Sequence, residues 1–333
     1  MSLPRVTFAA VCLGLGPLAA GAAPARPAPY KGAIVEEAVT GQVIFANNAD
    51  EVSPPASMTK LMTFAVLQDA ISRGALSRET RVKVVAADTR ASPSIIGLKV
   101  GEVFPMEELI YAMMLPSAND AALAVAREVA GSVPAFVELM NAKARALGMN
   151  HTTFRTPNGL PVPSHRVVDG DLTTPRDFAL LCRFLIQHTD ILKYTSVRTR
   201  IFGAGFRFPP TPMTSHNHLL GKIEGVDGLK TGFTNGAGFC LAATALRNNR
   251  RIIVVMMDSP DSKSRDLAVT DLIRRGFTTM PVFGPEGPMH DSAPAPAPPS
   301  AAMPGVAPAP VFAPPTRPAP AGTMPPIQFT PPR

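Results

Sequence analysis

The chain has 333 residues, of which 17% are charged, and its formal net charge is +7. Its length suits one large domain or two packed lobes. The densest basic runs, Arg247–Arg251 and Arg274–Arg275, are short and lack interleaved aromatic residues, so we predict no nucleic-acid partner.

Residues 1–22 have the pattern of an export signal. Arg5 comes before an apolar run from Val6 to Ala20, and the small residues Ala20-Gly21-Ala22 end it. No other apolar run approaches the ~20 residues that cross a bilayer. We therefore predict a cleaved signal, export to the periplasm or the outer face of the cell, and no membrane-spanning segment in the mature chain.

The first part of the mature chain is predicted to form a hairpin and a buried helix. The apolar runs 33–35 and 42–45 flank the turn signal Thr40-Gly41. A helix is then predicted from Ser57 to about Arg73. Its first three turns are almost entirely apolar, which indicates a helix buried on most sides.

The middle of the chain is predicted to be mostly helical. Apolar periodicity and terminal glycines indicate helices over residues 106–114, 120–130 and 133–147. A fourth helix is predicted to begin at Thr174-Pro175 and to run towards His188. A capping Thr before a Pro at the first helical position is a strong start signal.

The last third returns to strands, predicted over residues 225–232, 238–246 and 251–257. The turn Asn248-Asn249 joins the last two, and a closing helix is predicted from about Ser264 to Arg275, ending at Gly276. Strands near both chain ends around a helical middle predict an α/β (α+β) fold. In it, an antiparallel sheet is built from the two ends and a mostly helical lobe is inserted between them.

Residues 281–333 hold 18 of the chain's 37 prolines and many alanines. This composition lacks the apolar side chains that offset the entropy of ordering, so we predict a disordered Pro/Ala-rich tail. The domain between signal and tail is then 23–280.

Cysteine and histidine give little indication of a special site. Outside the signal, Cys182 and Cys240 either pair or are two buried thiols. His216 and His218 are close in sequence, but no carboxylate or thiolate accompanies them, which makes them a weak metal signal.

Ser57-Met58-Thr59-Lys60 lies where a proline-bearing loop meets the first long helix. A spacing of three residues places both ends of this motif on one helix face. Lys60 is the only cation in an apolar stretch, so desolvation is expected to lower its pKa and leave a neutral amine, a base for Ser57. Taken alone, the pair is weak evidence, because a serine helix cap followed by a solvent-reaching lysine is the commoner arrangement.

Two further motifs follow. Ser117-Ala118-Asn119 lies in a tight loop, where the hydroxyl can relay a proton and the amide can bind a peptide group. Taken alone, this motif is better explained by a capping box formed with Asp120. Lys230-Thr231-Gly232 lies on a predicted strand, where the glycine lets a ligand approach the backbone and the cation and hydroxyl suit a carboxylate. A solvated lysine on an edge strand is the alternative.

In this order and context, the three motifs resemble those of the penicillin-recognising serine peptidases, most closely the D-alanyl-D-alanine carboxypeptidases. The resemblance extends to Asn158-Gly159-Leu160 and Gly225–Gly232, and it covers about residues 30–280. It implies a β-lactamase/transpeptidase-like fold with neither cofactor nor metal. It also implies peptidoglycan stem peptides as substrates and β-lactam antibiotics as covalent inhibitors.

The resemblance implies a role for each motif residue. Ser57 would attack the carbonyl between two terminal D-alanines, Lys60 would take its proton, and Ser117 would pass a proton to the leaving amine. The substrate would be bound by Asn119 at a peptide group and by Thr231 and Arg265 at the terminal carboxylate, with Lys230, Gly232 and Phe233 beside it. The backbone N–H groups of Ser57 and Phe233 would form an oxyanion hole.

Three alternatives stay open. A serine β-lactamase shares the motifs, but its most familiar class uses a glutamate to activate the deacylating water, and no glutamate occurs between Leu139 and Ile223. An endopeptidase that cleaves peptide cross-links would use the same site. A non-catalytic wall-binding scaffold is disfavoured, because a scaffold has no need of this set of hydroxyl and amine side chains.

Overall fold

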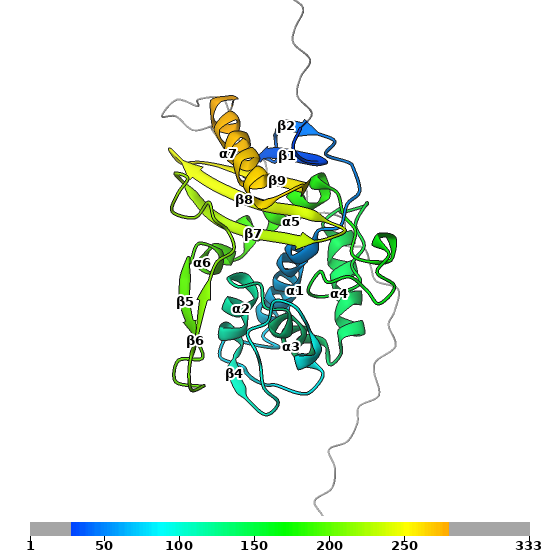
Figure 1. The fold of residues 1–333 in the computed structure, drawn as a ribbon, viewed down its shortest axis with the longest axis vertical. Coiled ribbons are helices and arrows are strands. Elements are labelled where there is room, and N and C mark those ends of the chain that lie inside the picture. The colour runs from blue at the N-terminus through cyan, green and yellow to red at the C-terminus, as the bar shows by residue number, and fades with distance from the viewer. Residues whose placement is uncertain (1–27, 280–333) are drawn as a thin grey trace, which may run out of the picture. The chain divides into compact units, whose positions relative to one another are not determined.

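A five-stranded antiparallel sheet with strand order β2-β1-β9-β8-β7 organises the fold (Figure 1). The computed structural model describes residues 28–279, so the predicted signal and tail lie outside the described residues. The strands are β1 (Gly32–Glu37), β2 (Val43–Asn47), β7 (Val226–Thr234), β8 (Gly238–Arg247) and β9 (Arg250–Ser259). Because β1 pairs with β9, the sheet joins the two ends of the described chain, as the sequence predicted.

The two predicted hairpins are confirmed. β1 and β2 are antiparallel neighbours, and so are β8 and β9. At the second turn, Asn248 and Asn249 have φ values of 48° and 60°. A two-residue hairpin turn with positive φ at both positions favours asparagine, which explains why this dipeptide was a usable signal.

Helices cover both faces of the sheet. α5 (Pro175–His188) contacts β9 and β1, whereas α7 (Ser262–Thr279) contacts β9 and β8. Within residues 252–257 of β9, the odd-numbered side chains join the larger hydrophobic cluster with α5, and the even-numbered ones join a second cluster with α7. Since alternate strand residues face opposite sides, an uninterrupted apolar run is what a strand covered on both faces requires.

The predicted end of the closing helix at Gly276 is wrong, because α7 continues to Thr279. A Cβ atom at Gly276 would lie 3.1 Å from side-chain atoms of both Ile252 and Val35. The glycine therefore allows the helix to approach the sheet closely and does not end it.

The remaining helices belong to the predicted inserted part of the chain and lie below the sheet in the view of Figure 1. They are α1 (Lys60–Ser72), α2 (Met106–Met114), α3 (Asn119–Ala130), α4 (Val133–Ala146) and the short α6 (Ile191–Thr195). α1 contacts α2, α3, α4 and α5, and its residues 60–67 are all buried. The predicted burial of this helix is confirmed.

Several short elements were not predicted. They are the 3-10 helices η1 (Ala56–Thr59), η2 (Asp88–Arg90) and η3 (Val167–Asp169), and the two-stranded pairs β3 (Arg81–Lys83) with β4 (Val103–Pro105) and β5 (Thr199–Phe202) with β6 (Thr211–Thr214). Strands of three or four residues are too short to show a period. Across residues 28–279, no helix has the length and apolar character needed to cross a membrane.

Candidate active site

The predicted site residues converge on one cleft of about 490 Å³ between the edge strand β7 and the helical lobe. Seven of them line it: Ser57, Ser117, Asn119, Thr231, Gly232, Phe233 and Arg265. Lys60 and Lys230 are buried behind this lining, at 0% and 1% exposure. The sequence motifs, far apart in the chain, are therefore brought together as expected.

Ser57 lies in η1, immediately before α1, so it precedes the α-helix that was predicted to begin with it. Its hydroxyl oxygen is 2.9 Å from Lys60 Nζ. Lys60 Nζ also donates to Asn119 Oδ1 and to the Asn158 carbonyl oxygen, both at 2.7 Å. The predicted pairing of Ser57 with Lys60 is thus present, together with two further oxygen atoms that hold the amine.

The hydrogen-bond pattern defines what a neutral Lys60 can do. The Asn158 carbonyl can only accept, and Asn119 Nδ2 donates to the Pro93 carbonyl at 2.6 Å, which directs Asn119 Oδ1 towards the amine. A neutral amine has two N–H groups, and these two acceptors use both. Its lone pair is then left for the hydroxyl proton of Ser57, which is the arrangement of an activated nucleophile.

The surroundings favour that neutral form. Complete burial lowers the pKa of Lys60 well below its usual value, and the nearby Lys230 lowers it further. The negative charges of Asp171 and Asp120 act in the opposite direction without reversing the shift. Desolvation, the cause expected from the sequence, is thus the largest contribution to the lowered pKa.

Ser117 is held in a strained conformation, with φ of 64°. Its buried hydroxyl oxygen has no hydrogen-bond partner among the described residues. The capping-box alternative is wrong: Ala118 is the N-cap of α3, and the Asp120 carboxylate accepts from the backbone N–H groups of Ile96 and Leu98. Strain together with an unpartnered hydroxyl at a cleft is typical of a functional position.

Cationic groups gather at one end of the cleft. Lys230 donates to the Thr231 carbonyl oxygen at 3.1 Å, and burial followed by the charge of Arg265 lowers its pKa to about 7. Arg265, 4% exposed, reaches the cleft from α7. His216 also lines the cleft, but burial together with Lys230 lowers its pKa to about 4, so it is neutral near pH 7 and adds no positive charge. This end of the cleft suits a carboxylate.

Gly232 lines the cleft, but the space where its Cβ atom would be is taken by the protein itself and is not left for a ligand as predicted. A Cβ atom there would lie 2.5 Å from the Pro55 carbonyl oxygen, so only glycine permits this contact between β7 and the loop before η1. Phe233 is half exposed, and its ring stacks on Phe239 with 4.2 Å between centroids.

Three contributors were missed. Asn158 was noted in a motif but given no role, because its contact with Lys60 uses a backbone carbonyl that no side-chain pattern reveals. His216 was considered only as a metal ligand. Nothing in the sequence indicated where Asp171 lies. It is buried and accepts hydrogen bonds from Thr59 and from the segment 155–156, and it thereby connects that segment to η1, the turn that carries Ser57.

Cys182 and Cys240 are both free and buried. In the part of the chain from 28 to 279, no group of three or more His, Cys, Asp or Glu residues is arranged to hold a metal ion.

The site thus combines a serine beside a buried amine with a nearby arginine, next to the edge strand of an antiparallel sheet. The family model described as D-alanyl-D-alanine carboxypeptidase matches residues 22–261. The chain belongs to the D-alanyl-D-alanine carboxypeptidase family.

Individual relatives agree with this assignment. The chain is 31% identical over 250 residues to D-alanyl-D-alanine carboxypeptidase DacF of Bacillus subtilis, covering 74% of this chain but only 62% of the relative. It is 32% identical over 231 residues to the D-alanyl-D-alanine endopeptidase of Escherichia coli, covering 68% of this chain and 70% of that protein. The crystal structure of penicillin-binding protein D2 from Listeria monocytogenes with bound ampicillin superposes with a TM-score of 0.66 at 32% identity, covering 75% of this chain and 98% of that one.

Proposed function

We propose that this protein is a serine-type D-alanyl-D-alanine carboxypeptidase that removes the terminal D-alanine from peptidoglycan stem peptides and is acylated by penicillins. The observation that carries the proposal is the Lys60 amine, which is buried, bound by two obligate acceptors and 2.9 Å from Ser57 Oγ. Family membership supports the same chemistry.

In the proposed first step, Ser57 Oγ attacks the carbonyl carbon between the two D-alanines as its proton passes to Lys60. The backbone N–H groups of Ser57 and Phe233 stabilise the resulting oxyanion. Collapse of this intermediate breaks the peptide bond and leaves an ester on Ser57. The departing amine receives a proton through Ser117, whose hydroxyl has no competing partner among the described residues. Water then hydrolyses the ester.

Substrate orientation follows from the cleft's charges. The terminal carboxylate binds at Thr231 and Arg265, with Lys230 contributing to the positive field, while the Asn119 amide holds the peptide group preceding the cleaved bond. In this orientation the cleaved carbonyl lies above Ser57. The remainder of the substrate extends past Gly232 and Phe233 along the edge of β7.

The test is release of free D-alanine from a pentapeptide ending in D-Ala-D-Ala, together with covalent labelling by a fluorescent penicillin. We expect both reactions in the wild type and neither in Ser57→Ala. An absence of labelling in folded wild-type protein would contradict the proposal and favour the scaffold alternative. Rapid turnover of the bound penicillin would favour a β-lactamase instead.

The endopeptidase is the second candidate, since a relative of similar identity carries that name. Mass spectrometry of digested muropeptides separates the two activities. Loss of one alanine from pentapeptides supports the carboxypeptidase, and conversion of cross-linked dimers to monomers supports the endopeptidase.

The location and domain boundaries are part of the proposal. We infer that residues 1–22 direct export to the periplasm or outer cell face, where wall peptides occur, that 23–280 form the catalytic domain, and that 281–333 are a tail. N-terminal sequencing of protein recovered from cells tests the first inference. A chain that still begins at Met1 would contradict it.

A further inference from the structure

The guanidinium group of Arg265 is held from one side by the carboxylate of the next residue. Arg265 Nε and Nη2 both donate to Asp266 Oδ1, at 2.9 and 2.7 Å. The Arg265 side chain is 4% exposed and that of Asp266 is 19% exposed. Because the pair is mostly removed from solvent, it is screened less than an ion pair at the surface.

This arrangement leaves one edge of the guanidinium group available. Asp266 takes the edge formed by Nε and Nη2, whereas Nη1 has no partner among the described residues. A guanidinium group is planar and rigid, so fixing one edge also fixes the direction of the other. The edge formed by Nη1 and Nη2 can donate to both oxygens of a carboxylate. Since Arg265 lines the cleft, this edge is the one left for a substrate.

Asp266 is itself held from a second side. Its Oδ2 lies 3.3 Å from His218 Nδ1, and an imidazole in the Nδ1–H tautomer donates to this oxygen. His218 lines the cleft and lies in the segment before β7, whereas Asp266 lies near the start of α7. The carboxylate therefore connects two segments of the chain that meet at the cationic end of the cleft.

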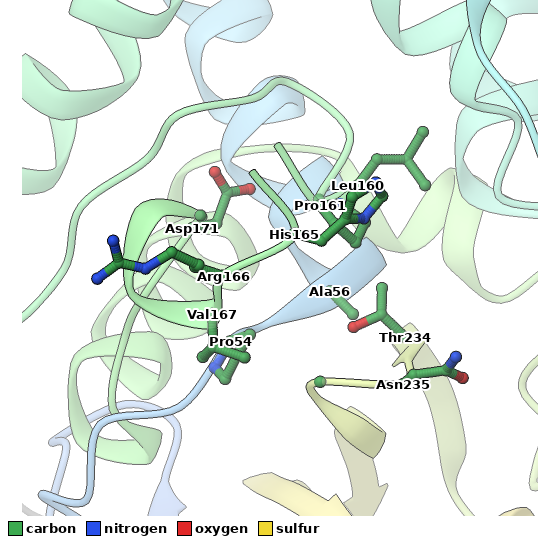
Figure 2. Close-up of a pocket in the computed structure, with 13 residues that line it drawn as sticks. Pro54, Ala56, Leu160, Pro161, His165, Arg166, Val167, Asp171, Thr234 and Asn235 are labelled. Carbon is green, nitrogen blue, oxygen red and sulfur yellow. The ribbon is translucent and has the colours of Figure 1, made fainter. Parts of the chain in front are cut away.

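Two other carboxylates near the cleft are used differently. Asp171, which Figure 2 shows in the lining of a pocket beside η1, accepts four hydrogen bonds, three of them from residues 155 and 156. Asp120 accepts from backbone N–H groups of the segment 96–98. Both carboxylates hold loop backbone in place. Asp266 is instead directed at a cationic side chain that lines the cleft.

We propose that Asp266 is a positioning residue that holds Arg265 in the direction in which it binds the terminal carboxylate of the substrate. The proposal rests on the function proposed above, in which Arg265 and Thr231 bind that carboxylate. Without Asp266, the substrate itself has to order the long arginine side chain, and the rotamer entropy lost in doing so weakens binding. In this role Asp266 acts through Arg265 and does not itself contact the substrate.

Two substitutions separate positioning from charge. Asp266→Ala removes the acceptor for Arg265. Asp266→Asn removes the negative charge but keeps an oxygen that can accept from the same N–H groups. Asp271→Ala is the matched control, because Asp271 lies on the same helix, forms an ion pair with Arg275 at 2.7 Å and does not line the cleft.

The experiment measures kcat and KM for diacetyl-L-Lys-D-Ala-D-Ala and for the same peptide ending in a carboxamide. We expect the wild type and Asp271→Ala to prefer the acid by about tenfold or more, as a charge-assisted bidentate pair commonly gives. Asp266→Ala should raise KM for the acid peptide by about tenfold with kcat nearly unchanged, because ground state and transition state share the carboxylate contact. Asp266→Asn should show a clearly smaller increase. Equal turnover of the carboxamide peptide by all four proteins shows that the variants are folded.

An equal decrease for both peptides in Asp266→Ala would overturn the proposal, because the residue would then support the site as a whole. The same increase in KM for Asp266→Ala and Asp266→Asn would also overturn it, since charge alone would then matter. So would an unchanged KM in Asp266→Ala, or a wild type without preference for the acid. Each of these results leaves the proposed carboxypeptidase activity intact. A wild type that releases neither D-alanine nor D-alaninamide is a different outcome, and it would remove the proposed function together with the positioning role.

Discussion

At the scale of single residues, the site depends on how a buried amine is surrounded. Among residues 28–279, Lys60 has no counter-ion in direct contact; its three hydrogen-bonding neighbours there are a hydroxyl, an amide oxygen and a backbone carbonyl. Neutral acceptors hold the amine in place without stabilising its positive charge as a carboxylate would. The position of the Lys60 amine and its basicity are therefore controlled by different features of its surroundings.

Replacing Lys60 by methionine tests this separation. Lys60→Met keeps the length of the side chain and removes the base, so we expect acylation by penicillin to fall by about 10²–10⁴-fold, the usual contribution of general base catalysis. The rate constant for fluorescent penicillin labelling is the measurement, with Ser57→Ala as the zero-rate control. A decrease of less than tenfold would show that another group accepts the Ser57 proton.

Lys230 provides a second test, through the pH dependence of stability. Its pKa is lowered from 10.5 in an unfolded chain to about 7 in the folded protein. Between these values the unfolded state binds the extra proton, so the free energy of unfolding should rise with pH, by up to about 1.4 kcal/mol per pH unit for this group. Denaturant unfolding from pH 7 to 8.5 measures the slope.

Lys230→Met is the matched variant for that measurement. It should show a shallower rise over the same interval, because its residue 230 cannot bind a proton in either state. The interval stops at 8.5 because burial raises the pKa values of Cys182 and Cys240, so ionisation of these thiols in the unfolded chain opposes the trend at higher pH. Equal slopes in the two proteins would mean that Lys230 stays charged in the fold.

At the scale of elements, η1, the turn that carries Ser57, is held in place by a close backbone contact between Ala56 and Gly159. A Cβ atom at Gly159 would lie 1.9 Å from the Ala56 carbonyl oxygen, and Gly159 has φ of 80°. The same segment presents the Asn158 carbonyl to Lys60. The position of η1 and the position of the base are thus coupled through one glycine.

Gly159→Ala should therefore lower both stability and acylation. Gly148→Ala is the matched control, since Gly148 has a similar φ of 77° but open space around the position of a Cβ atom. We expect the control to cost about 1 kcal/mol of unfolding free energy without changing penicillin labelling. Gly159→Ala should cost clearly more and slow labelling at least tenfold; equal behaviour of the two variants would contradict the coupling.

Most helices and strands were predictable from the sequence because a repeating apolar pattern, or a characteristic capping or turn residue, marks them. Thr174 does cap α5, accepting from the Asp177 backbone N–H at 3.1 Å, and the asparagine turn does close β8 and β9. The prediction failed where one residue type serves two purposes, as with Gly276, which was interpreted as a helix end but allows close packing. The three motifs identified the cleft, whereas the Asn158 carbonyl has no side-chain signature.

At the scale of the whole described unit, α7 has two functions. It covers one face of the sheet with apolar residues such as Val269 and Ile273, and it brings Arg265 to the cleft. The family match ends at residue 261, before this helix begins. The second hydrophobic cluster is incomplete without α7, so we infer that the folding unit extends beyond the region of the match.

Two truncated chains test this inference. A chain ending at residue 261 should fail to fold cooperatively, because the sheet face beneath α7 is exposed. A chain ending at residue 280 should unfold like the full-length protein and label with penicillin at the same rate. Thermal unfolding and labelling are the measurements. Cooperative unfolding of the shorter chain, or loss of labelling in the longer one, would contradict the proposed boundary.

The pairing of β1 with β9 has a consequence for biosynthesis. Ala33 of β1 is opposite Met256 of β9, so β1 cannot pair with β9 until almost the entire domain has been synthesised. Closing so long a loop is slow, and contacts of this kind delay folding. The nascent polypeptide therefore emerges without a finished sheet or a catalytic edge, and we expect it to stay inactive until synthesis has passed its last strand.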